Sequence, residues 1–153
     1  MKKILFVINL MEDTFFVTSL FVIGFVIIDV IVPENIIFFK NVISITCHQQ
    51  PERCFFILNK PIALCARCLG IYLGFAVFYK SVNKMQYSLY LYYFSISYVV
   101  FNLVAELGLK LNGSNAIRFL FGLTFSFVMI KLIDLIRKYA VRQNFELRVS
   151  KAL

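Results

Sequence analysis

The four cysteines and the single histidine of this 153-residue chain all fall between positions 47 and 68. They are Cys47, His48, Cys54, Cys65 and Cys68. Random placement would rarely bring them so close together, so the grouping indicates a chemical role. Thiolate sulfur and imidazole nitrogen are preferred ligands of zinc, and four of them complete a tetrahedral site. We therefore predict a transition-metal site, most simply for Zn²⁺, with Cys47, His48, Cys65 and Cys68 as ligands.

The spacing C-A-R-C places Cys65 and Cys68 three residues apart, in the first turns of an expected helix. Residues three apart on a helix share one face, so the two sulfurs are expected to be neighbours. The helix N-terminus and the intervening Arg67 both favour the thiolate, which is the form of cysteine that binds metals. The preceding loop is then expected to bring Cys47 and His48 back to this pair.

Two other interpretations of the thiols stay open. An outward-facing loop lies in an oxidising compartment, where Cys65 and Cys68 would suit a membrane thiol-disulfide oxidoreductase or a structural disulfide. Four-helix membrane thiol oxidases relay electrons through a second cysteine pair, but the segment 109–116 holds no cysteine. The thiols, Cys54 among them, could also be unligated and behave as small apolar side chains. The chain has no nucleotide-binding or hydrolase motif, so the sequence leaves open whether the protein is an enzyme.

The composition decides what kind of scaffold carries these residues. Hydrophobic residues make up 61% of the chain and charged residues 16%, and the mean hydropathy is +0.83. Soluble domains average roughly 45–50% apolar and about 25% charged residues. The apolar residues also occur in long runs, which excludes a disordered chain, a collagen and a repeat solenoid. We predict an all-α polytopic membrane protein, with residues 1–153 as a single domain.

Four apolar stretches are close to the roughly 20 residues that a membrane-spanning helix requires. They are residues 14–32, 62–79, 87–109 and 116–136. Glu12 and Asp13 precede the first stretch, as acidic residues often precede a helix. Gly70 and Gly74 form a G-x-x-x-G step in the second, which predicts close packing against another helix. A shorter run, 36–46, is expected to be interfacial or re-entrant. The prediction is a bundle of four transmembrane helices with a Cys/His-containing loop.

The basic residues predict the orientation of this bundle. Nine lysines and arginines fall on the side of the two termini and four to six on the other, which places both termini in the cytoplasm. The Cys/His module, residues 47–68, then lies at the extracytoplasmic face. The net charge of +8 is thus explained by the lipid bilayer as partner and does not require nucleic acid. The basic tail, residues 137–153, is expected to act as a topology signal or to lie on anionic headgroups.

A group of polar residues is expected near the cysteines, at the outer ends of the spans. Its members are Arg53, Arg67, Asn102, Glu106, Asn115 and Arg118. Ionisable groups inside spans are costly and usually face the bundle or a cavity. Arg67 and Arg118 could therefore hold an anionic lipid headgroup or a small anion, which would suit a small carrier or lipid-binding protein. Alternatively, the arginines pair with Asp29 and Glu106 or extend to the nearby interface.

Two segments of the chain carry a family resemblance. The segment C-H-Q-Q-P-E-R-C-F-F-I begins at Cys47, and P-I-A-L-C-A-R-C-L-G-I-Y-L-G begins at Pro61. Together they resemble the signature of the prokaryotic membrane proteins catalogued as domain of unknown function 2085. A later element that includes Asn102, Glu106, Asn115 and Arg118 is similar to the family's pattern. The resemblance implies a membrane fold and this residue set, but no established activity.

The chain departs from that pattern at two positions. Cys54 stands where the family usually has serine, which argues against Cys54 as an essential ligand. Asn102 stands where aspartate is expected, which argues against a role for this position as an acid or base. The resemblance therefore implies Cys47, His48, Cys65 and Cys68 as the shared metal-ligand candidates.

Overall fold

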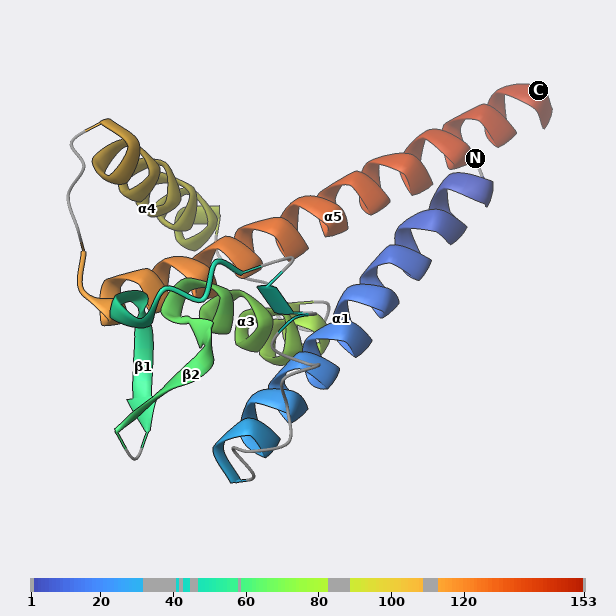
Figure 1. Cartoon of the computed structure of the whole chain (residues 1–153). Coiled ribbons are helices and arrows are strands. Elements are labelled where there is room, and N and C mark those ends of the chain that lie inside the picture. Colours follow the sequence, from blue (N-terminus) through green and yellow to red (C-terminus); the bar gives the residue numbers. More distant parts are fainter. Residues whose placement is uncertain are drawn as a thin grey trace.

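The computed structural model describes residues 2–31, 41, 43–44, 47–57, 59–82, 89–108 and 113–152. The side chains of residues 2–5, 80–82, 89, 91, 106–108 and 144–152 are outside this description. The described chain is mostly helical and carries one small hairpin (Figure 1). Its elements are helix α1 (Lys2–Ile31), the single turn η1 (Pro51–Arg53), strands β1 (Cys54–Ile57) and β2 (Lys60–Cys65), and helices α3 (Ala66–Val82), α4 (Leu89–Gly108) and α5 (Asn115–Ala152).

Two of these helices are long and apolar enough to cross a membrane. They are α1, over Phe6–Ile31, and α5, over Asn115–Gln143. The helices α3 and α4 contain shorter apolar stretches, Ala66–Tyr79 and Tyr92–Ala105. Many large apolar side chains on α1, α4 and α5 are exposed, among them Phe21 and Phe101. Such surfaces suit contact with lipid chains, whereas monomeric soluble proteins rarely expose large contiguous apolar patches. Helices occur in all four expected regions, and two of them are candidate spans.

The longest helix, α5, packs along α3 and also contacts α1 and α4 (Figure 1). It continues without a break from the apolar stretch into the basic segment 137–152, so the predicted tail is helical up to Ala152. At about 1.5 Å per residue, its 38 residues extend for about 57 Å, well beyond a hydrocarbon core of about 30 Å.

The first helix begins earlier than the sequence analysis expected. Glu12 and Asp13, predicted to precede the helix, lie inside α1. Glu12 is buried and forms an ion pair with Arg137 of α5. Asp13 accepts a hydrogen bond from the hydroxyl of Tyr79 at the end of α3. Both carboxylates therefore have partners on other helices, and α1 extends beyond these two residues to its start at Lys2.

Four small residues bring α3 and α5 into close contact. A Cβ atom added to Gly70 would lie 2.2 Å from the carbonyl oxygen of Phe119, and one added to Gly74 would lie 2.7 Å from Cβ of Ser126. From the other side, a Cβ on Gly122 would lie 2.3 Å from the carbonyl oxygen of Arg67. Small residues allow helix backbones to approach this closely. The predicted packing role of Gly70 and Gly74 is confirmed.

A β-hairpin precedes α3 where the sequence analysis expected a helix from residue 62. In the antiparallel hairpin, Cys54 pairs with Cys65 and Ile57 with Lys60. Asn59 adopts a left-handed conformation at the turn (φ 61°), which asparagine tolerates better than most residues. The apolar run 62–64 is buried in a cluster that includes Val26 of α1. The all-α prediction thus misses a two-stranded element, and Cys65 ends a strand instead of lying on the helix.

Candidate metal centre

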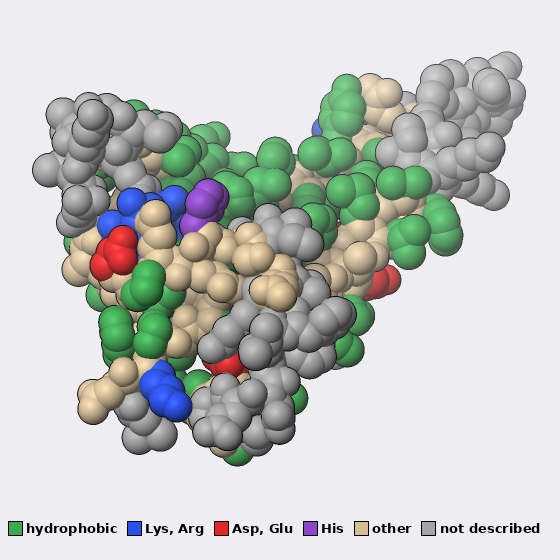
Figure 2. All heavy atoms as spheres, viewed as in Figure 1, with side chains coloured by type: hydrophobic (Ala, Val, Ile, Leu, Met, Phe, Trp, Pro, Cys, Tyr) green, Lys and Arg blue, Asp and Glu red, His purple; other side chains and the backbone are tan. Residues whose placement is uncertain are grey.

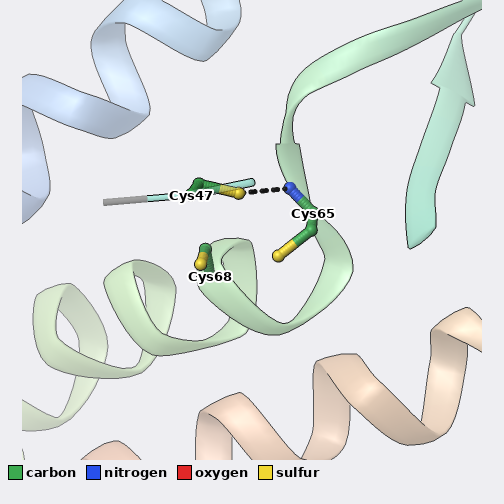
Figure 3. A group of neighbouring side chains, drawn as sticks. All are labelled: Cys47, Cys65 and Cys68. Carbon is green, nitrogen blue, oxygen red and sulfur yellow. Dashed lines mark hydrogen bonds between the residues drawn. The ribbon is translucent and has the colours of Figure 1, made fainter. Parts of the chain in front are cut away.

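Three cysteine sulfurs converge at the start of α3. The Sγ atoms of Cys47, Cys65 and Cys68 all lie within 4.8 Å of one another. Figure 3 shows the three side chains close together where β2 meets α3. They come from three different segments: the chain before η1, the last residue of β2, and the first turn of α3. Among the described residues, this is the group whose donor atoms could hold a metal ion.

Backbone contacts hold Cys47 next to the other two thiols. The backbone N–H of Cys65 donates a hydrogen bond to Sγ of Cys47, with an N–S distance of 3.3 Å (Figure 3). The backbone N–H of Cys47 donates to the carbonyl oxygen of Ile43 at 2.9 Å. Cys47 is only 2% exposed and belongs to the apolar cluster between α1 and β2. The hairpin and the end of α1 therefore position this ligand candidate.

Hydrogen bonds around Cys47 favour its thiolate. Those from the thiols of Cys65 and Cys68, followed by those from the backbone N–H groups of Cys65 and Gln49, hold the pKa of Cys47 well below its ordinary value. Burial opposes this effect but is weaker than the two thiol hydrogen bonds. Gln49 has a left-handed backbone (φ 50°), which is uncommon for a residue other than glycine. The chain thus turns directly after Cys47 and His48.

His48 lies apart from the three sulfurs. Its side chain is exposed, and it does not belong to the group whose donor atoms lie within 4.8 Å of one another. It does line the same cavity as Cys47, Cys65 and Cys68. The structure therefore places His48 beside the centre, and its ligand role stays a prediction.

Cys54 is also outside the group of three. It is 1% exposed, and its thiol donates a hydrogen bond to the carbonyl oxygen of Gln50 at 3.2 Å. Burial, and to a lesser extent the charges of Cys65, Cys47 and Glu52, raise the pKa of Cys54 to about 11. Cys54 thus lies outside the group of three, and its pKa is raised whereas that of Cys47 is lowered.

The raised pKa of Cys54 predicts slow alkylation. A pKa about two units above the ordinary 9.0 lowers the thiolate fraction at pH 8 roughly 100-fold. We expect iodoacetamide to label Cys54 at least that much more slowly in the folded protein than in urea, as followed by peptide mass spectrometry. Equal labelling rates in the folded and unfolded protein would contradict this.

The same shift makes the free energy of unfolding depend on pH. Because the pKa of Cys54 in the folded protein, about 11, is higher than its ordinary value of 9.0, the protonated thiol contributes stability below pH 9 that is lost as the pH rises through 11.

A basic cavity of about 460 Å³ opens beside the sulfurs. Its described lining comprises Cys47, His48, Gln49, Gln50, Arg53, Cys65, Arg67, Cys68 and Arg118. Three arginines and a histidine therefore face it, and this described lining contains no carboxylate. Figure 2 shows basic side chains gathered beside the histidine on this face, with an acidic side chain close to them. Gln49 and Gln50 are additions to the predicted site. Their position directly after the C-H pair is a signal that could have indicated them.

The remaining predicted polar residues are not part of this described lining. Asn115 donates from its side-chain amide to the carbonyl oxygen of Cys54 at 2.9 Å, which ties the start of α5 to β1. Arg118 donates to the side-chain oxygen of Asn115 at 3.3 Å. Asn102 donates to the carbonyl oxygen of Tyr98 on its own helix at 2.9 Å. Glu106 belongs to α4, but its side chain lies outside the described residues.

Comparison with known proteins assigns the family. Residues 47–132, more than half of the chain, match the family described as "Predicted membrane protein (DUF2085)". The chain belongs to the DUF2085 family. It is also 46% identical over 48 residues to the uncharacterized protein MJ1492 of Methanocaldococcus jannaschii. That match covers 29% of this chain and 31% of the archaeal protein. No solved structure matches the chain.

The DUF2085 match begins at the first candidate ligand and includes the whole site. It starts at Cys47, extends past Gly122 in α5, and therefore contains the three converging thiols, the three arginines and the glycines between α3 and α5. The resemblance that the sequence analysis based on the cysteine segments is confirmed. The chain is a DUF2085 membrane protein in which a cluster of cysteines could bind a metal.

Proposed function

We propose that this membrane protein binds a transition metal, most simply zinc, through Cys47, Cys65 and Cys68, with His48 as the fourth ligand. The observation that carries the proposal is that the Sγ atom of Cys47 and those of Cys65 and Cys68, at the junction of β2 and α3, lie within 4.8 Å of one another. The metal would join the chain before η1, the hairpin and α3. Its role is to hold an irregular loop on the helices at the extracytoplasmic face.

The donor atoms fit such an ion. Zinc–sulfur bonds are about 2.3 Å long, so the sulfurs of a tetrahedral site lie roughly 3.8 Å apart. The three Sγ atoms of this protein need only a small inward movement to reach that spacing. Soft thiolate ligands favour zinc, copper(I) and iron–sulfur chemistry over magnesium or calcium. The hydrogen bond from the Cys65 backbone to the Cys47 sulfur stabilises the thiolate that binding requires.

The arginines are consistent with this proposal. A zinc ion with three thiolates carries one net negative charge, whether or not a neutral histidine completes the site. Arg67 lies between Cys65 and Cys68 in the sequence and lines the cavity into which this centre faces, so it would offset that charge. His48 lines the same cavity, and we propose that its side chain moves toward the sulfurs when the metal binds.

Elemental analysis of anaerobically purified protein tests the proposal. We expect about one metal ion per wild-type chain, and less than a tenth of that in Cys65→Ser, because serine removes a thiolate ligand. Cys54→Ser is the matched control, since Cys54 lies in the same hairpin but outside the group of three. It should retain the wild-type metal content. Metal-free wild-type protein, or equal loss in both variants, would refute the proposal.

Thiol-disulfide oxidoreduction by Cys65 and Cys68 is the second candidate function. It is favoured by the same closeness of the sulfurs and by the four cysteines being free thiols in the structure. Forming the disulfide would release two protons and pass two electrons to an oxidant such as a quinone. A metal-free preparation with a reversible two-electron couple, which also forms a mixed disulfide trapped by Cys68→Ser, would support this function over metal binding.

A further inference from the structure

The cavity beside the thiols has more positive charge than the proposed metal centre needs. Arg53, Arg67 and Arg118 all line it, and its described lining has no carboxylate. The one net negative charge of the metal centre is smaller than the summed positive charge of these three arginines. Glu52 lines an adjoining cavity with Arg53 and Arg118, and it offsets at most one more. The cavity is therefore electrostatically suited to an additional anion.

The arginines come from different elements, and two of them have contacts that hold them in place. Arg53 belongs to η1, Arg67 to α3 and Arg118 to α5. The guanidinium of Arg67 lies over the ring of Phe121, 5.2 Å from its centre. Arg118 is hydrogen-bonded to Asn115, whose own amide is anchored to β1. Planar guanidinium groups bind phosphate oxygens through paired hydrogen bonds, and immobilised ones lose less entropy on binding.

An apolar crevice adjoins the same arginines. Arg67 and Arg118 also line a cavity of about 180 Å³ between α4 and α5. Its apolar walls include Phe101, Ile117 and Phe121. Phe101 is 70% exposed and Ile117 45% exposed, so the crevice is bordered by the outer apolar surface of the helices. A charged cavity that meets an apolar surface matches a ligand with an anionic head and an apolar chain.

We propose that Arg53, Arg67 and Arg118 bind the phosphate group of an anionic lipid whose apolar chain lies against Phe101, Ile117 and Phe121. The cavity of about 460 Å³ is within the range of small-ligand sites. Free phosphate shares the headgroup chemistry, but it would make no use of the apolar crevice. The site goes beyond the proposed metal binding, because its binding groups are arginines and not thiols.

The test uses the full chain in a neutral detergent and measures lipid binding by native mass spectrometry. The probes are dioctanoyl-phosphatidylglycerol, dioctanoyl-phosphatidylcholine and inorganic phosphate. We expect phosphatidylglycerol to bind at least tenfold more tightly than the other two. Arg118→Gln and Arg67→Gln should each weaken its binding roughly 10-fold to 100-fold, the range for losing hydrogen bonds between charged groups. Arg142→Gln, on an exposed part of α5, is the matched control and should bind as the wild type does.

The outcomes separate this site from the metal centre. Arg118→Gln should lose lipid affinity but keep its metal. Cys65→Ser should lose its metal and, because Arg53 lies in the segment that the metal holds, part of its lipid affinity as well. Equal affinity for phosphatidylglycerol and phosphatidylcholine, or for phosphatidylglycerol and free phosphate, would overturn the lipid assignment. If Arg118→Gln bound the lipid as tightly as the wild type does, the arginine site itself would be refuted. The same holds if this variant lost its metal together with the lipid. If Arg67→Gln does not fold because Arg67 packs on Phe121, Arg118→Gln and Arg53→Gln still decide the matter.

Discussion

Chelation of the metal is expected to make the backbone amides of residues 47–65 exchange hydrogen about 100-fold faster, or more, than in the metal-bound protein. That factor corresponds to about 2.7 kcal/mol of local stability. The reason is that, among the described residues, this segment has few backbone hydrogen bonds other than those of the hairpin. Besides the hairpin pairing, its described backbone hydrogen bonds include one from Cys47 to Ile43 and one from Arg53 to Gln50. Structural zinc typically contributes folding free energy of this size or larger.

Hydrogen exchange read by mass spectrometry checks this expectation peptide by peptide. Peptides from the middle of α5 serve as an internal reference, because their amides are bonded within a continuous helix and should change little. The Cys65→Ser variant provides the second control. Its 47–65 segment should already exchange quickly, and the chelator should have no further effect on it. Equal protection of the segment with and without chelator would show that the metal does not hold it.

Replacing Gly122 by alanine should lower the free energy of unfolding by about 1–3 kcal/mol, the usual cost of forcing extra atoms into a packed contact. The new Cβ would lie 2.3 Å from the carbonyl oxygen of Arg67 and 2.7 Å from the backbone nitrogen of Ile71. Both are backbone atoms of α3 and cannot rotate away, so α3 and α5 must separate. Denaturant unfolding in detergent, followed by circular dichroism, measures the change.

Gly24 is the matched control for this substitution. It lies in α1, and a Cβ added there would have no neighbour within 4 Å. Gly24→Ala should therefore be neutral or stabilise the protein by up to about 1 kcal/mol, because alanine favours helix more than glycine does. Gly122→Ala should also weaken metal and lipid binding, since the displaced segment carries Arg67 and Cys68. If the two alanine variants were equally stable, close packing at Gly122 would not be required.

Much of the fold follows from local sequence patterns. Long apolar runs predict the regions of α1, α3, α4 and α5, because a helix satisfies its own backbone hydrogen bonds wherever apolar side chains exclude water. The small-residue step at Gly70 and Gly74 predicts the contact with α5, since only small side chains allow such an approach. The grouping of cysteines indicates the centre, because thiols close in sequence are readily brought together.

The hairpin could not be predicted in the same way. The run I-A-L-C before α3 is apolar and continuous with the following helix, and a short apolar run has no periodicity that separates strand from helix. Its strand conformation depends on pairing with β1 and on burial against α1. The ion pair between Glu12 and Arg137 is a similar case, because these residues are 125 positions apart. Their contact requires α1 and α5 to be already packed.

The sequence by itself determined that this is a mostly helical membrane protein of the DUF2085 family with a thiol-rich segment, because composition, apolar runs and motif are local properties of the chain. Only the tertiary structure decided which side chains meet. It brought Cys47 to Cys65 and Cys68, left Cys54 buried outside that group, and placed Arg53, Arg67 and Arg118 around one cavity. The physical reason is that helix packing and strand pairing bring these segments together. Both depend on contacts between distant parts of the chain, so no single stretch of sequence can indicate them.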